Sequence, residues 1–310
     1  MNFENFEFKS KDGTKIVGYK WIPKNGKLKG VVQISHGMAE HAARYDEFAN
    51  VLGKVGYVVY SSDHRGHGKT AGSLNNVGYF ADENGWDLVV DDLYAVTKIA
   101  KSAYPNLPLF FFAHSMGELF GRDFISIHHK DLKGVILSAT GGDPGLLGII
   151  SRIVGGFITK SEAKKKGKKF PSKLNQMSFG NFNNAFKPNR TDFDWLSRDE
   201  KEVDKYIADP YCGFICSTGH FIDLLKGIEL INSTENINKI PKDLPIYFFA
   251  GDLDPVGNNS KTVTKVFNAY KKAGIKDLEL KFYKNARHET LNEINRKEVF
   301  ADVISWLDKH

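Results

Sequence analysis

The sequence of 310 residues lacks long hydrophobic runs and has very few cysteines. No stretch approaches the ~20 consecutive apolar residues that a membrane-spanning helix needs. The N-terminal stretch has no apolar core of the kind found in signal peptides. The two cysteines, Cys212 and Cys216, are too few for a disulfide framework, and their four-residue spacing differs from the C-x-x-C of redox and zinc sites. We therefore expect a cytoplasmic protein.

The charge is only moderately unbalanced, with 43 basic against 37 acidic residues and a formal net charge of +6. Much of the excess lies in one run, Lys164–Lys169, which apolar residues precede and Phe170 follows. A solvated lysine run is the simplest interpretation, and peripheral attraction to an anionic membrane surface is the alternative. The sequence has no nucleic-acid-binding motif and no basic stripe interleaved with aromatic residues, so nucleic acid is not an expected partner.

Short apolar runs rich in β-formers alternate with amphipathic segments such as 86–104. Near-continuous hydrophobic runs are typical of parallel strands that are covered on both faces. The alternation predicts an α/β fold with a mostly parallel, doubly wound sheet, preceded by an antiparallel hairpin at its edge. The expected strands are 31–37, 57–63, 109–115, 134–140 and 245–251, a further strand has the sequence LELKFY, and the hairpin covers 3–10 and 15–23.

The alternation stops after residue 142 and resumes at residue 241. Between them, at 143–240, the composition shifts to Lys, Asn, Phe and Ser, with helix-like pieces but no buried strand pattern. This predicts an inserted, mainly helical cap (lid) on a core that is formed by residues 1–142 and 241–310.

One serine stands at the end of a buried strand and directly before a helical pattern, in the stretch FFFAHSMGELF. This context predicts a nucleophile elbow, in which a sharp turn lifts the hydroxyl of Ser115 above the sheet. The strand and the helix pass close together there, so small residues are needed two positions before and two after the serine. Ala113 and Gly117 occupy these positions.

A serine hydroxyl needs a base to take its proton and a carboxylate to orient that base. In this fold the chain order is serine, acid, histidine. Asp254 lies in the loop after one predicted strand and His288 in the loop after the next, so we assign them as acid and base. Asp252, which is closer to its strand, is expected to tie the loop together through local hydrogen bonds.

The oxyanion that forms during acyl transfer needs two backbone N–H donors, each contributing about 3 kcal/mol. Met116, directly after the serine, and Met38, in the loop after an earlier strand, are the expected donors. Such a site requires no metal and no organic cofactor. His64 and His67 could be imagined as metal ligands, but a hydrogen-bonded loop beneath the site explains them better.

Five motifs in order resemble the α/β-hydrolase superfamily, and within it the monoacylglycerol lipase and lysophospholipase branch. This resemblance implies a Ser115–Asp254–His288 triad, the amides of Met38 and Met116 as the oxyanion hole, and hydrolysis of carboxylic esters. Two positions depart from the pattern: Ala113 stands for a glycine and Thr70 for a serine. The motifs, spread over residues 36–292, are HGMAEHAARY, DHRGHGKT, AHSMG, GDLDPVG and ARHETLNE.

The branch implies a small ester or monoacyl lipid, such as a monoacylglycerol or a lysophospholipid, as substrate. Two alternatives stay open: an aminopeptidase-like amide hydrolase, which would need cap carboxylates such as those in 197–204, and a non-catalytic binder of hydrophobic ligands. Several aromatic residues in the insertion could line an acyl tunnel or simply pack together, namely Phe170, Phe179, Phe182, Phe186, Trp195 and Phe214.

Overall fold

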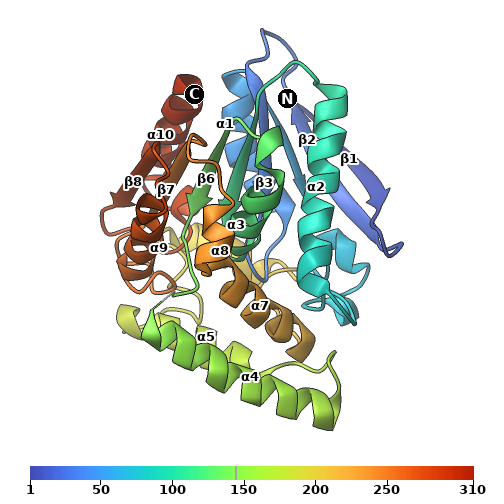
Figure 1. Ribbon diagram of the computed structural model, residues 1–310, viewed down its shortest axis with the longest axis vertical. Helices are drawn as coiled ribbons and strands as arrows, with labels where there is room; N and C mark the ends of the chain where they lie inside the picture. Colours follow the sequence, from blue (N-terminus) through green and yellow to red (C-terminus); the bar gives the residue numbers. More distant parts are fainter. Residues whose placement is uncertain (144) are drawn as a thin grey trace.

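The computed structural model describes the backbone of residues 1–143 and 145–310, and their side chains apart from those of 146–148, 150, 176, 178 and 179. An eight-stranded sheet has the order β1-β2-β4-β3-β5-β6-β7-β8 (Figure 1). β2 pairs antiparallel with β1 and β4, and the remaining neighbours are parallel. The strands are β1 Asn2–Lys9, β2 Lys15–Ile22, β3 Gly30–Ser35, β4 Tyr57–Ser62, β5 Leu109–His114, β6 Gly134–Ser138, β7 Ile246–Gly251 and β8 Leu278–Tyr283.

The sheet confirms the predicted fold class and the edge hairpin. The six residues of β5 are all buried, as are those of β3, β4 and β7. Helices cover both of its faces, which explains why these strands are apolar without alternation.

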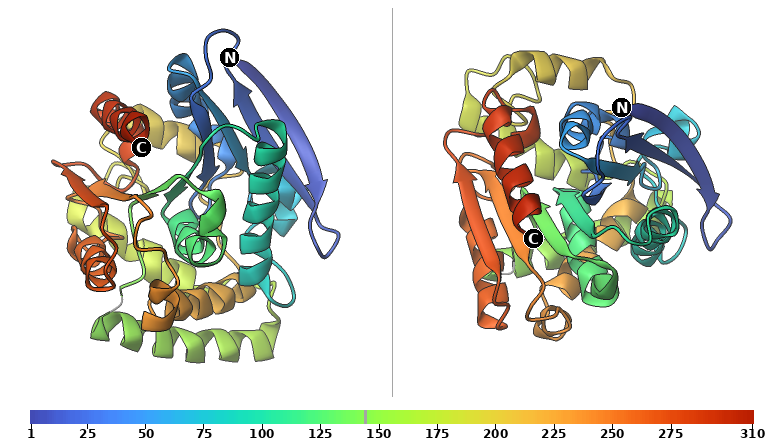
Figure 2. Two further views of the ribbon diagram at one scale, coloured as in Figure 1. Left: turned by 45° about the horizontal axis from the view of Figure 1, so that its top comes forward. Right: turned by 90° about the horizontal axis from the view of Figure 1, so that it is seen from above.

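The helices form two layers around the sheet, and each layer has its own buried cluster (Figure 2). One cluster joins the sheet to α1 (Asp46–Lys54) and α10 (Arg296–Lys309). The other joins it to α2 (Gly85–Ala103), α3 (Met116–His128) and α9 (Lys261–Lys272). Short 3-10 helices lie at Ala42–Tyr45, Gly68–Ala71, Leu74–Asn76, His129–Asp131, Asn183–Phe186 and Thr290–Asn292.

The chain between β6 and β7 is helical and lies beyond the carboxyl ends of the parallel strands (Figure 1). Its described residues form no strand of the sheet, only an isolated bridge between Pro171 and Ser217. The boundaries of this segment as a separate cap, 143 and 240, stay a prediction. Its helices are α4 Leu146–Lys166, α5 Lys173–Phe182, α6 Glu200–Ala208, α7 Thr218–Ile231 and α8 Thr234–Asn238.

No helix within the described part of the chain combines the length and the apolar character needed to cross a membrane.

Candidate active site

Ser115 lies on the sharp turn between β5 and α3, as the sequence predicts. Its backbone angles, φ 54° and ψ −118°, are in a region that residues other than glycine rarely adopt. The turn is held by the Ser115 amide, which donates to the carbonyl of Ser138 at 3.0 Å. The hydroxyl is thereby presented at the N-terminus of α3, where the helix dipole favours developing negative charge.

The small side chains at the turn are required by different close contacts. A Cβ atom on Gly117 would lie only 2.3 Å from the carbonyl oxygen of Ser35 and 2.5 Å from that of His36, both backbone atoms at the end of β3. Ala113 is fully buried, and a Cβ atom on Gly121 would lie 3.1 Å from its methyl group. Because Gly121 has no side chain, the methyl group of Ala113 fits at the position where the G-x-S-x-G pattern has its first glycine.

His288 joins the serine to the acid. Its Nε2 lies 2.8 Å from Oγ of Ser115, and its Nδ1 lies 2.9 Å from Oδ1 of Asp254. Asp254 is completely buried and His288 is 3% exposed, so water does not compete for these bonds. Burial lowers the pKa of His288, but the charge and the hydrogen bond of Asp254 outweigh it, and the pKa is raised overall. The geometry fits Nδ1–H donating to Asp254 and Nε2 accepting from the Ser115 hydroxyl.

Asp252 does not tie the acid loop as expected. Its Oδ1 is buried and has no hydrogen-bond partner among the described residues. The loop is instead held by Asp254, whose Oδ1 also accepts from the amide of Val256 at 2.9 Å. The interpretation of Asp252 is therefore wrong, because the acid that orients the histidine also makes the local backbone contact.

Met38 and Met116 both line the pocket that contains Ser115. Among the hydrogen bonds of the described residues, neither of their backbone N–H groups has an acceptor. The turn before Met38 is held by Glu40, whose Oε1 accepts from the amide of Gly37 at 2.5 Å. Two N–H groups without an acceptor thus belong to residues that line the pocket of Ser115, which is compatible with the expected oxyanion hole.

A buried ion network, which the sequence analysis missed, connects the loop of Met38 to the loop of His288. Arg44 donates to Glu40 at 2.6 Å and to both carboxylate oxygens of Glu289 at 2.6 and 2.7 Å. Burial alone would raise the pKa of Glu289, but the Arg44 guanidinium holds it below its usual range. The signal was present in the letters E and R of the motif HGMAEHAARY and in the E that follows His288.

The DHRGHGKT loop stabilises the segments around the site through buried hydrogen bonds. Asp63 accepts from the amide of Ala42 at 2.9 Å, and Thr70 accepts from a backbone amide of β2 at 2.9 Å. His64 and His67 are buried and bonded, His64 to Ser35 at 3.2 Å and His67 to the carbonyl of Arg65 at 2.8 Å. Thr70 therefore acts on loop structure, as expected from its place in the motif.

A pocket of about 250 Å³ lies between Ser115 and the helical insertion. The insertion also contacts the histidine loop directly: the amide of His288 donates to the carbonyl of Trp195 at 3.3 Å, and that of Glu289 to the carbonyl of Leu196 at 2.8 Å. The lining is mostly apolar and includes Met38, Met116, Leu119, Phe182, Trp195, Leu196, Tyr206, Phe221, Leu224, Ile228 and Val256.

The aromatic residues of the insertion have different surroundings. Phe182 and Trp195 line this pocket, and Phe214 lines a neighbouring cavity of about 660 Å³ that shares Trp195 with it. Phe170 is exposed, and Phe186 lies under the guanidinium of Arg287 at 4.2 Å. The side chain of Phe179 lies outside the described residues.

Residues 26–295 match the sequence model of the family described as serine aminopeptidase, S33. The chain belongs to this family of α/β-hydrolases. It is 29% identical over 307 residues to a monoacylglycerol lipase of Mycolicibacterium smegmatis, a match that covers 96% of this chain and 94% of the relative. It is 26% identical over 300 residues to monoglyceride lipase of Rattus norvegicus, covering 96% and 88%.

A solved structure of a thermostable carboxyl esterase from Bacillus coagulans, in complex with glycerol, is similar over 100% of this chain and 99% of that one. The TM-score is 0.90 and the sequence identity 30%. These findings confirm the α/β-hydrolase resemblance and identify the chain as an esterase- and lipase-like serine hydrolase.

Proposed function

We propose that this protein hydrolyses carboxylic esters that carry one acyl chain, with monoacylglycerols and lysophospholipids as its substrate class. The observation that carries the proposal is the hydroxyl of Ser115, bonded to His288 and facing a mostly apolar pocket. Such a lining suits an acyl chain, which loses water-exposed apolar surface on entry. The similarity to two monoacylglycerol lipases supports the same class.

In the proposed reaction, Oγ of Ser115 attacks the ester carbonyl carbon while Nε2 of His288 takes the hydroxyl proton. The carbonyl oxygen becomes an oxyanion that accepts from the amides of Met38 and Met116. The bond to the alcohol then breaks, and His288 returns the proton to the departing oxygen. Water attacks the acyl-enzyme with His288 again as the base, which releases the fatty acid and restores Ser115.

The aminopeptidase alternative needs a free carboxylate to hold a substrate amine. Among the described residues, the carboxylates that border the pocket are Glu40 and Glu289, and both are bonded to Arg44. The acidic residues of α6 do not border the pocket. This arrangement favours an uncharged ester over a substrate with a free amine.

The test is a chain-length series of p-nitrophenyl esters, 1-monoacylglycerols and lysophosphatidylcholines, with aminoacyl p-nitroanilides alongside. We expect ester turnover that falls at least about a thousandfold in Ser115→Ala and stays unchanged in Ser102→Ala, an exposed serine at the end of α2. Equal rates in wild type and Ser115→Ala would show that Ser115 does not catalyse ester hydrolysis. Binding of hydrophobic ligands would then be the remaining function. Faster cleavage of the anilides than of any ester would support the aminopeptidase.

We further infer that the insertion contacts lipid surfaces through α4. Ile149, Ile153 and Phe157 repeat every four residues on one side of this helix and are exposed, Phe157 by 72%. Gly155, on the other side, packs against Leu225 of α7. Exposed lysines follow at Lys164–Lys169. An apolar stripe with adjoining lysines is the arrangement that binds an anionic interface.

A further inference from the structure

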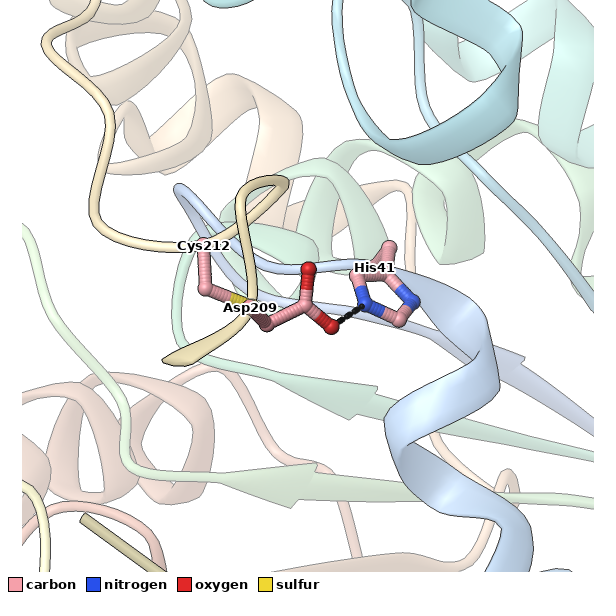
Figure 3. A group of neighbouring side chains, drawn as sticks. All are labelled: His41, Asp209 and Cys212. Carbon is pink, nitrogen blue, oxygen red and sulfur yellow. Dashed lines mark hydrogen bonds and ion pairs between the residues drawn. The ribbon is translucent and has the colours of Figure 1, made fainter. Parts of the chain in front are cut away.

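A group of three metal-binding side chains lies outside the candidate active site, where the core meets the helical insertion. His41 comes from the loop after β3, three residues beyond Met38, while Asp209 and Cys212 come from the segment between α6 and α7. Figure 3 shows the side chains of His41 and Asp209 facing each other, with Cys212 beside Asp209. Nε2 of His41 lies 2.8 Å from Oδ2 of Asp209, and the three potential ligand atoms all lie within 4.8 Å of one another.

We propose that His41, Asp209 and Cys212 bind a divalent transition-metal ion, best suited to Zn²⁺, with water as the fourth ligand. Imidazole nitrogen, carboxylate oxygen and thiolate sulfur are the ligands that zinc takes in proteins, whereas Mg²⁺ and Ca²⁺ prefer oxygen alone. Ligands of a tetrahedral zinc site lie about 3–4 Å apart, as follows from metal–ligand distances of roughly 2.0–2.3 Å. Small side-chain rotations would therefore convert the present cluster into a site.

The surroundings allow an ion to enter and balance its charge. A surface pocket of about 330 Å³ is bordered by His41 and Asp209, and Asp209 is 32% exposed. Cys212 is a free cysteine and only half-buried. With neutral His41, ionised Asp209 and a thiolate at Cys212, a Zn²⁺ ion would complete an uncharged group. The nearby positive charge of Arg44 is already matched by its two carboxylate partners.

Because of where the cluster lies, a bound ion would link the helical insertion to the loop of Met38. The insertion is held to the loop of Met38 by the amide of Gly213 and the hydroxyl of Tyr206, which donate to the carbonyl of Ala39 at 2.9 and 2.8 Å. A metal ion shared by His41 and the insertion would reinforce this junction, two residues from Ala39. Because the ligands come together only in the folded chain, binding must raise the unfolding temperature.

The test uses the full chain, reduced and stripped of metal, with Zn²⁺ titrated in competition with a chromophoric chelator and Co²⁺ as the spectroscopic probe. We expect one Zn²⁺ per chain and a rise in Tm. Cys212→Ser should weaken Zn²⁺ binding by at least about tenfold, since even the loss of a partner that only orients a ligand costs about 10–100-fold. Cys212→Ser should also abolish the thiolate-to-cobalt charge-transfer band.

Two controls keep the outcome decisive. Cys216→Ala removes the other cysteine, which is fully buried, and should leave both the affinity and the cobalt band unchanged. His41→Gln should weaken Zn²⁺ binding as much as Cys212→Ser does. If Cys212→Ser fails to fold, His41→Gln takes its place in the test. The proposal is overturned if Zn²⁺ does not bind, if all variants bind equally, or if binding is lost only in His310→Ala, which alters a second cluster of Asp277, Glu279 and His310.

Discussion

At the residue scale, the proposed chemistry depends on the imidazole of His288, whose pKa is shifted in opposite directions by its surroundings. Burial disfavours a charged His288, while the carboxylate of Asp254 favours it, and the carboxylate prevails. The result suits a base that must accept a proton from Ser115 and hold it briefly. The ring is fixed at both nitrogens, so it does not have to reorient between the two transfers.

The raised pKa of His288 predicts how activity depends on pH. The histidine works as a base only when it is neutral, so kcat/KM should fall as the pH drops through the pKa of the free enzyme. Because that pKa lies above the usual value of about 6.5, the midpoint of the acid limb should also lie above 6.5. A pH profile of kcat/KM on a soluble short-chain ester measures it.

Asp254→Asn is the matched variant for this prediction. Without the carboxylate, the charge and the hydrogen bond that raise the pKa of His288 most are lost and only the weaker effects of Glu289 and Glu40 still oppose burial, so the midpoint should move to lower pH while kcat falls by about 10⁴-fold. A wild-type midpoint at or below 6.5, or one that Asp254→Asn leaves in place, would contradict the assignment of Asp254 as the partner of His288.

At the scale of elements, the site depends on two loops that are far apart in the chain. Arg44 lies in the 3-10 helix Ala42–Tyr45, directly before α1, and its carboxylate partners come from the Met38 loop and the His288 loop. The side chain of Arg44 is 11% exposed, and the side chains of Glu40 and Glu289 are 4% and 8% exposed. The loop of Met38, the proposed oxyanion donor, and the loop of His288, the proposed base, are thus held by the same cation.

Arg44→Met is expected to lower the free energy of unfolding by about 3–5 kcal/mol, because it leaves two buried carboxylates without their cation. Urea denaturation measures the change. The matched control is Lys15→Met, which removes the exposed ion pair with Glu7, where both side chains are more than half exposed; its cost should stay below about 1 kcal/mol. Similar costs for the two variants would show that the Arg44 network does not hold the loops together.

At the scale of the whole molecule, the helical insertion has two sides with different surroundings. Its inner side covers Ser115 and supplies Phe182, Trp195 and Leu224 to the pocket. Its outer side exposes the apolar stripe of α4 and the lysines that follow it. In the proposed contact with a lipid surface, this outer side would face the membrane.

Replacing Lys164, Lys165, Lys166, Lys168 and Lys169 by glutamine is expected to reduce hydrolysis of monoacylglycerol in anionic vesicles, each lysine near the surface contributing about 1 kcal/mol to binding. Hydrolysis of a soluble p-nitrophenyl ester should not change, since none of these lysines borders the pocket. Flotation of the protein with the vesicles, at low and high salt, measures the attraction directly. Unchanged activity and flotation would rule out contact through this run.

Much of the architecture could be predicted from the sequence because its signals are local. A buried strand is a run of apolar residues, and an elbow is a serine between a strand and a helix with small neighbours. The predicted strands, the helix at 86–104 and the residues that meet at Ser115 all follow from such patterns. The parallel order also places Asp254 and His288 after adjacent strands, at the same edge of the sheet.

Only the tertiary structure decided the contacts between distant segments. Arg44 and Glu289 are separated by 245 residues, and His41 and Asp209 by 168. No local pattern encodes such a pair, because its formation depends on how the whole chain packs. The wrong expectation for Asp252 has the same origin: it stands two residues before Asp254, and only the fold shows that the amide of Val256 donates to Asp254 while Oδ1 of Asp252 has no partner among the described residues.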